Sequence, residues 1–269
     1  MDTVISKDGT PIAYDRVGEG PALVVVDGAF AHPAINPTTG QLGALLSPAF
    51  TVVSYARRGR GESGDTKPFA KQREIEDLGA VVEAVGGTAF VLGGSSGSFL
   101  VLDAAAAGLP IRRLAVYEPP IIVDDSRPPL PADYVEHLDR LTAEGRIGDA
   151  VAYFMTAAMG MPEPMVDGMR QGPFWPELEK VAPTLAYDGT FVAETMSGRP
   201  LDPARWTGIE APVLVIDGGA SESFMHTGAD ALAAVLEHAE RRTLEGQTHD
   251  VAADVLAPVL AEFFGPAGR

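Results

Sequence analysis

The segment Gly93-Gly94-Ser95-Ser96-Gly97 follows directly on the apolar run Ala89–Leu92 and precedes an alanine-rich stretch of helical pattern. Strand, G-x-S-x-G and helix in this order form a nucleophile elbow, whose tight turn strains the serine and exposes its hydroxyl at the edge of a sheet. The N-terminus of the following helix favours developing negative charge at the same place. Only Ser95 fits the pattern, because a register centred on Ser96 puts Ser98 where the last glycine is required. The sequence therefore predicts a serine nucleophile at residue 95.

Short apolar, β-branched runs alternate with helical patterns, which predicts an α/β fold with a mostly parallel central sheet and helices on both faces. Continuous apolar runs are typical of central parallel strands, since both of their faces are buried. The expected strands are Thr3–Ser6, Ile12–Arg16, Leu23–Val26, Thr51–Tyr55, Ala89–Leu92, Arg113–Tyr117, Val213–Ile216 and Arg241–Leu244. The expected helices are Gln41–Leu46, Lys71–Val85, Ser98–Ala107, Ala229–Leu236 and Val251–Phe264.

This alternation stops between about Asp124 and Trp206, where proline, methionine and helical patterns dominate and no strand pattern occurs. The stretch Arg127–Pro131 is rich in proline, which is typical of a stiff connection. We therefore expect a core formed by residues 1–123 and 207–269 and an inserted helical lid of residues 124–206.

Composition excludes several classes of protein. The 269 residues include no cysteine, so there is no thiol nucleophile and no cysteine-bound metal, and the net charge of −17 opposes nucleic-acid binding. The chain starts without a signal-peptide pattern and contains no apolar run near the ~20 residues of a membrane span. We therefore expect a cytoplasmic monomer or homodimer with no membrane partner. We also expect no metal and no other cofactor, because the histidines lack metal-ligand spacing and the sequence lacks a dinucleotide-binding fingerprint.

Four motifs in chain order resemble the α/β-hydrolase superfamily. They are Val26–Phe30 after the third strand, Arg57–Ser63 after the fourth, the elbow at Ser95, and Gly246–His249 before the last helix. The order nucleophile, acid, histidine is that of this fold. The resemblance implies an α/β-hydrolase fold and hydrolysis through a Ser-His-acid triad.

His249 is the expected general base, later the acid toward the leaving group. Of the five histidines in the chain, it alone stands in a loop between the last expected strand and the last expected helix. That loop lies at the carboxyl edge of the sheet, where the elbow also lies. The position predicts that His249 takes the proton from Ser95.

The acid of the triad departs from the usual pattern. The superfamily most often carries it in a G-x-x-D sequence after the strand Val213–Ile216, but here that position holds Ser221. A minority of the superfamily carries the acid one strand earlier, where this chain has Glu118. A buried carboxylate at that strand end needs a partner, and His249 would supply it. We expect Glu118 to be the acid, with Asp217 and Glu222 as alternatives.

The oxyanion hole is expected to combine the backbone N–H of Ser96 with an N–H of Gly28 or Ala29. The arginine-rich turn at Arg57–Gly61 resembles the superfamily's D-R-R-G-x-G turn, with Ala56 in place of the acidic residue. Arginines in such a turn are expected to tie loops together through fork-shaped hydrogen bonds.

The expected lid is rich in methionine and aromatic residues, which form adaptable apolar walls. Small-molecule pockets are mostly apolar with few polar anchors, so we expect a small hydrophobic substrate. The residues expected to line its pocket are Phe30, His32, Met155, Met159 and Trp175. The Asp27-Gly28 pair, the Ser-Ser elbow and Glu118 are together similar to the zearalenone-degrading lactonases, which implies lactone opening as one candidate activity.

The leading hypothesis is a serine hydrolase that cleaves a hydrophobic carboxylic ester or lactone. Epoxide hydrolases and haloalkane dehalogenases share the fold but need a carboxylate at the elbow, which Ser95 does not supply. A perhydrolase, a carbon–carbon bond hydrolase and a thioesterase or cyclase would use the same triad and stay open. A non-catalytic receptor for a small ligand also stays open, since one fold hosts many functions.

Overall fold

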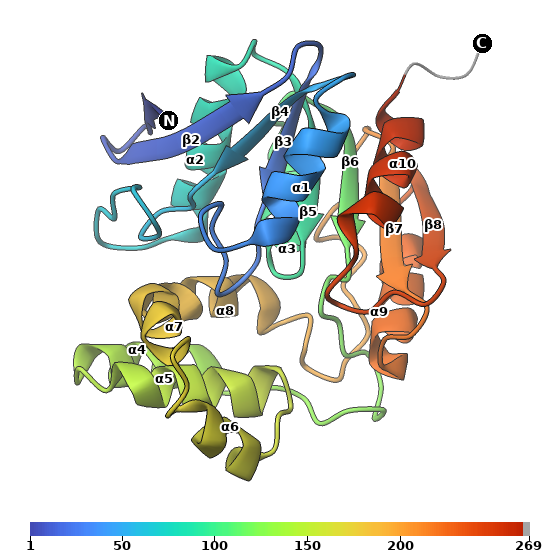
Figure 1. Ribbon diagram of the computed structural model, residues 1–269. Coiled ribbons are helices and arrows are strands. Elements are labelled where there is room, and N and C mark those ends of the chain that lie inside the picture. The colour runs from blue at the N-terminus through green and yellow to red at the C-terminus, as the bar shows by residue number, and fades with distance from the viewer. Residues whose placement is uncertain (266–269) are drawn as a thin grey trace.

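The computed structural model describes residues 1–265, which are built around one eight-stranded sheet (Figure 1). The strands lie in the order β1-β2-β4-β3-β5-β6-β7-β8. β1 pairs with β2, and β2 with β4, in antiparallel fashion, and all other neighbours are parallel. The strands are β1 (Asp2–Ile5), β2 (Pro11–Val17), β3 (Ala22–Val26), β4 (Thr51–Tyr55), β5 (Ala89–Gly94), β6 (Ile111–Tyr117), β7 (Val213–Gly218) and β8 (Ala239–Leu244). The predicted α/β fold with a mostly parallel sheet is confirmed.

Helices cover both faces of the sheet. On one face lie α2 (Lys71–Ala84), α3 (Gly97–Ala106) and α9 (Ser223–Val235), and on the other lie α1 (Pro37–Leu46) and α10 (Ala253–Phe264). The strand β3 shows why both faces need cover. Val24 and Val26 point into the core under the first group, whereas Leu23 and Val25 point into the core under the second.

Between β6 and β7 the chain forms a helical segment, which we define as α4 to α8. Its helices are α4 (Tyr134–Ala143), α5 (Ile147–Tyr153), a π-helical turn (Phe154–Ala158), α6 (Glu163–Met169), α7 (Trp175–Val181), a 3₁₀ turn (Ala182–Thr184) and α8 (Leu185–Val192). They gather beyond one end of the sheet, with α8 nearest to it (Figure 1). Within residues 1–265, no helix has both the length and the apolar composition needed to cross a membrane.

Two helices begin earlier than the sequence pattern predicts. α1 starts at Pro37, where Asn36 caps the helix by accepting a hydrogen bond from the N–H of Thr38. α9 starts at Ser223 and runs through Gly228, where a β-carbon would stand 2.8 Å from Ile121. Close packing therefore requires glycine there, although glycine weakens the helical pattern in the sequence.

The strand order changes direction at β3, and the loops that follow β3 and its neighbour β5 separate there and leave space for a site. β4 pairs with one edge of β3 and β5 with the other. The chain continues from β3 into α1 on one face and from β5 into α3 on the opposite face. The two loops diverge at the carboxyl ends of the strands, which is where open α/β sheets bind their ligands.

Candidate active site

Ser95 lies in the turn between β5 and α3, at this point of divergence. Its φ of 50° lies in the left-handed region, which costs an L-residue roughly 1–2 kcal/mol. Its N–H donates to the Tyr117 carbonyl at 2.9 Å, which fixes the turn against β6. A side chain at Gly97 would stand 2.6 Å from the Val26 carbonyl oxygen, so the helix can approach β3 only with glycine there. The turn therefore has the geometry of the expected elbow.

Glu118 directly follows β6 and turns its side chain into the protein. The side chain is fully buried, and the φ of 46° is again in the left-handed region. One carboxylate oxygen accepts hydrogen bonds from the Gly218 N–H at 2.8 Å and the Ser221 hydroxyl at 2.5 Å. The other lies 2.8 Å from Nδ1 of His249. The carboxylate is thus held by three groups from β7 and the two loops that follow β7 and β8.

The contact with Glu118 sets the chemistry of the His249 ring. Burial raises the pKa of the Glu118 carboxyl, but the hydrogen bonds from His249, Ser221 and Gly218 outweigh it and hold that pKa below its usual value. An ionised carboxylate only accepts hydrogen bonds, so Nδ1 of His249 carries the proton and Nε2 is left as a proton acceptor. This is the tautomer that a general base for a serine needs.

The alternative acids lie elsewhere. Asp217 is fully buried, but its partners are His226, Arg241 and Thr243. Glu222 has a largely exposed side chain that lies 3.9 Å from Arg127. Among residues 1–265, the carboxylate bonded to His249 is that of Glu118.

Ser95 and His249 line one cavity of about 300 Å³, together with Gly28, Ala29 and Tyr117. No hydrogen bond joins the Ser95 hydroxyl to the His249 ring within the part of the chain that is described. Such catalytic hydrogen bonds are often longer in unliganded enzymes and tighten when substrate binds. The two residues thus line one cavity, and the contact that a complete triad would add is the hydrogen bond between the Ser95 hydroxyl and the His249 ring.

The loop after β3, where the second half of the oxyanion hole is expected, lies against the elbow. Gly28 packs against Ser95 so closely that a β-carbon there would stand 2.9 Å from the Ser95 β-carbon. The Ala29 N–H, however, donates to the hydroxyl of Ser96 at 2.9 Å. Of the two donors expected from this loop, Ala29 is therefore engaged by a side chain. Across residues 1–265, the non-glycine residues with positive φ are Phe30, Ser95 and Glu118, and strained backbone of this kind clusters at functional sites.

None of the five residues expected to line the pocket lines this cavity. Met155 and Trp175 are buried in the apolar core cluster that also contains side chains of α2, α3 and α9, and the indole N–H of Trp175 donates to Glu179. Met159 is 46% exposed.

The remaining two of the five lie in the loop after β3. The Phe30 ring meets the Phe154 ring edge-on, with 4.7 Å between the centroids. The His32 carbonyl accepts from the N–H groups of Ile35 and Asn36 just before α1. The cavity is lined instead by the segment 35–39, by Leu42 of α1 and by residues 249–251. It therefore extends toward the face of the sheet that carries α1 and α10.

Two side chains near the site were missed by the sequence analysis. Asp188 of α8 accepts a hydrogen bond from the Ser96 hydroxyl at 2.7 Å, and Ser221 donates to Glu118. The signal for Asp188 was a lone acidic residue in an apolar helix, and the signal for Ser221 was its place at the usual acid position. No cluster of three or more histidine, aspartate or glutamate side chains in residues 1–265 could hold a metal ion.

The geometry agrees with what the chain resembles. Residues 24–261 match the alpha/beta hydrolase family. A crystal structure of an alpha/beta hydrolase from Sphaerobacter thermophilus is 53% identical in sequence and has a TM-score of 0.88. That match covers 98% of this chain and 100% of the other.

More distant structures share the fold. An enol-lactonase from Burkholderia xenovorans is 20% identical with a TM-score of 0.70, and the match covers 98% of this chain and 100% of that one. An esterase from a Rhodococcus species is 18% identical with a TM-score of 0.67, and the match covers 99% of each chain. With a family match over most of its length and a 53% identical relative, the chain belongs to the alpha/beta hydrolase family.

Proposed function

We propose that this protein hydrolyses a hydrophobic carboxylic ester or lactone through an acyl-enzyme on Ser95, with His249 as general base and Glu118 as the acid of the triad. The observation that carries the proposal is the 2.8 Å contact between Glu118 and Nδ1 of His249 beside a strained serine. Within a family of hydrolases, this arrangement supports hydrolysis over binding alone. Burying the Glu118 carboxylate costs free energy, and its partner His249 lines the same cavity as Ser95.

In the proposed mechanism, His249 Nε2 removes the hydroxyl proton of Ser95 as the oxygen attacks the substrate carbonyl. The negative charge that develops on the carbonyl oxygen is stabilised by the Ser96 N–H and by the loop after β3. His249 then gives its proton to the departing alcohol, which leaves an ester on Ser95. A water molecule, activated in the same way, releases the acid. Glu118 stays ionised throughout and stabilises the protonated imidazole.

The residues that line the cavity favour an apolar substrate group. Its volume of about 300 Å³ is at the small end of the range of roughly 300–1,000 Å³ for ligand pockets. Its larger aliphatic lining residues are Val25, Val26, Ile35, Leu42, Leu92, Val251 and Leu256. A short acyl or ring segment fits such a space better than a charged one, because an unpaired charge buried there would lose its hydration.

The test is covalent labelling followed by turnover. We expect a fluorophosphonate to add one adduct to the intact protein, measured by mass, and no adduct to Ser95→Ala. A panel of aryl esters of rising acyl length and of lactones would then give kcat and KM. A folded parent protein that gains no adduct, or one that is labelled equally in Ser95→Ala, would contradict the proposal.

A further inference from the structure

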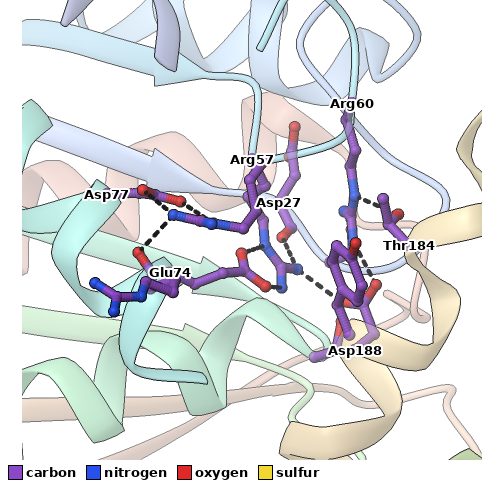
Figure 2. A network of polar contacts seen from close by, with 12 residues as sticks. Asp27, Arg57, Arg60, Glu74, Asp77, Thr184 and Asp188 are labelled. Atoms are coloured by element: carbon purple, nitrogen blue, oxygen red, sulfur yellow. Dashed lines mark hydrogen bonds and ion pairs between the residues drawn. The ribbon is translucent and has the colours of Figure 1, made fainter. Parts of the chain in front are cut away.

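A buried network of charged side chains joins the helical segment to the loops of the site (Figure 2). At its centre is Asp188 of α8, whose side chain is 1% exposed. One of its carboxylate oxygens accepts from Arg57 at 2.6 Å and from the Ser96 hydroxyl at 2.7 Å, and the other accepts from Arg60. Glu74 of α2 binds Arg57 through two further hydrogen bonds of 2.6 and 2.8 Å. Two arginines and two carboxylates thus balance in charge.

The same arginines hold the backbone of the loop after β3. Arg57 donates to the Asp27 carbonyl at 3.2 Å, and Arg60 donates to the carbonyls of Gly28 at 2.6 Å and Ala31 at 3.1 Å. This loop carries the expected donors of the oxyanion hole. The turn Arg57–Gly61 therefore ties loops together as predicted, and it does so around Asp188.

The Ser96 hydroxyl links Asp188 directly to that loop. A hydroxyl has one proton to donate, and an ionised carboxylate can only accept. Burial raises the pKa of the Asp188 carboxyl, but the charges of Arg57 and Arg60 and the Ser96 hydrogen bond outweigh it, so the carboxyl stays ionised. Because the Ser96 hydroxyl donates its one hydrogen bond to Asp188, a lone pair of the Ser96 oxygen is left to accept from the Ala29 N–H, 2.9 Å away.

The hydrogen bonds thus run in one direction, from Ala29 through Ser96 to Asp188, and each bond in such a chain strengthens the next. Ser96 is thereby held in place by its side chain, while its backbone N–H remains available to the oxyanion. Stability alone does not explain the arrangement, because burying charged pairs often costs as much as it returns. What the network fixes is the position of the loop after β3 relative to the elbow.

We propose that Asp188 is a positioning residue for the oxyanion hole, acting through the Ser96 hydroxyl on the loop that contains Ala29. The proposal rests on the proposed function of Ser95. Through Asp188, α8 would be a fixed part of the site. Without the Asp188 carboxylate, the Ser96 hydroxyl rotates freely and the Ala29 N–H loses its fixed acceptor. The loop then shifts relative to the elbow, which weakens binding of the transition state more than binding of the substrate.

The expected kinetic effect is a loss of kcat at nearly constant KM. Removing an oxyanion-hole donor outright costs about 10²–10³ in kcat, and displacing the loop costs less. We expect Asp188→Ala and Ser96→Ala, each of which removes one partner of the Ser96–Asp188 hydrogen bond, to lower kcat about tenfold to a hundredfold. The double variant should lose little more than either single variant, since both act on one chain of hydrogen bonds. Ser96→Thr keeps the hydroxyl and should restore most of the activity.

The matched control is Asp77→Ala. Asp77 is as deeply buried as Asp188 and binds Arg58 through two hydrogen bonds of 2.7 Å each, but it has no contact with the loop after β3. It should lose stability in urea unfolding without a selective loss of kcat. Asp188→Ala leaves two arginines short of a partner and risks misfolding, so the small change Ser96→Ala is the primary variant.

Amide hydrogen exchange tests the same inference without turnover. A peptide spanning residues 27–31 should exchange faster in Ser96→Ala and Asp188→Ala than in the parent protein and in Asp77→Ala. Unchanged exchange of that peptide in folded Ser96→Ala, or an unchanged kcat in a protein that fluorophosphonate labels at Ser95, would overturn the inference while leaving the proposed function intact. A parent protein without the adduct would instead refute the proposed function, and the exchange experiment would still decide the positioning role.

Discussion

Replacing Glu118 by glutamine changes one atom of the side chain and tests the assignment of the acid. In Glu118→Gln the amide oxygen of the new side chain can still accept from the Gly218 N–H and the Ser221 hydroxyl, which in the parent bind one carboxylate oxygen. The amide nitrogen then faces Nδ1 of His249 and donates to it. His249 must therefore carry its proton on Nε2, where it cannot take the proton of Ser95.

The size of the effect follows from this wrong tautomer. The same kind of change in a serine protease triad lowers kcat about 10⁴-fold, which is about 5 kcal/mol at about 1.36 kcal/mol per factor of ten. Since the hydrogen bonds from Gly218 and Ser221 survive and the contact with His249 loses only its charge, folding should lose no more than about 1–3 kcal/mol. Steady-state hydrolysis of an aryl ester gives kcat, and urea unfolding gives the loss of stability.

Asp217→Asn is the matched control, because Asp217 stands beside Gly218, is equally buried and binds no atom of His249. It should lose stability through its contacts with Arg241 and His226 but keep the kcat of the folded protein. Glu118 is not the acid if Glu118→Gln keeps its kcat within about tenfold of the parent, and the same conclusion follows if Asp217→Asn shows the larger loss.

Two further predictions concern the stability of the site. Gly97→Ala should destabilise the fold by about 1–3 kcal/mol, measured by urea unfolding, because the new β-carbon would stand 2.6 Å from the Val26 carbonyl and 2.7 Å from that of Asp27; an unchanged midpoint would contradict the close approach. The lowered pKa of Glu118 stabilises the folded protein fully above its unfolded value of 4.5, and this stability is lost as the pH falls through the lower folded value. Urea unfolding between about pH 3 and 7 should therefore show a shallower acid slope for Glu118→Gln than for the parent, and equal slopes would argue against the shift.

The sequence predicts the sheet well because its central strands are buried on both faces. An apolar run such as Leu23–Val26 has few alternatives to a central parallel strand, and it becomes β3. The start of α1 was missed although Asn36 and Pro37 form a recognisable cap. Gly228 in α9 could not be understood from the sequence, because the glycine is required by Ile121, which lies far away along the chain.

The candidate site likewise contains residues that the sequence predicts from local motifs and residues that only the fold brings together. Ser95 and His249 stand in local motifs, and Glu118 holds the position after the next strand where a minority of the superfamily carries the acid, so the sequence placed these residues at one edge. The lining of the cavity was not predictable in this way, since Met155 and Trp175 belong to a segment whose short helices have no sheet to set their register. Asp188 reaches Ser96 across 92 residues, and only the packed structure reveals such a pairing.

Ser221 suggests a final experiment, because it occupies the position where the superfamily most often carries the acid. Its hydroxyl lies 2.5 Å from the carboxylate of Glu118, so a carboxylate at position 221 would enter the space beside His249. Ser221→Asp alone would place two carboxylates together, which raises the pKa of one of them and holds it protonated. In a Glu118→Gln background the new carboxylate has no such rival and can accept from Nδ1 of His249.

We therefore expect Ser221→Asp to raise the kcat of Glu118→Gln at least about tenfold, because it returns the proton of His249 to Nδ1. The matched control is Ser221→Asn in the same background, which offers an amide of the same shape without the charge and should give no recovery. Steady-state hydrolysis of one aryl ester by the three folded variants decides the matter. Equal recovery by aspartate and asparagine would show that space rather than charge limits Glu118→Gln, whereas no recovery by aspartate would mean that a carboxylate at position 221 cannot reach His249. In that case the carboxylate must lie at the end of β6, where the backbone already holds Glu118 in a left-handed conformation toward the ring.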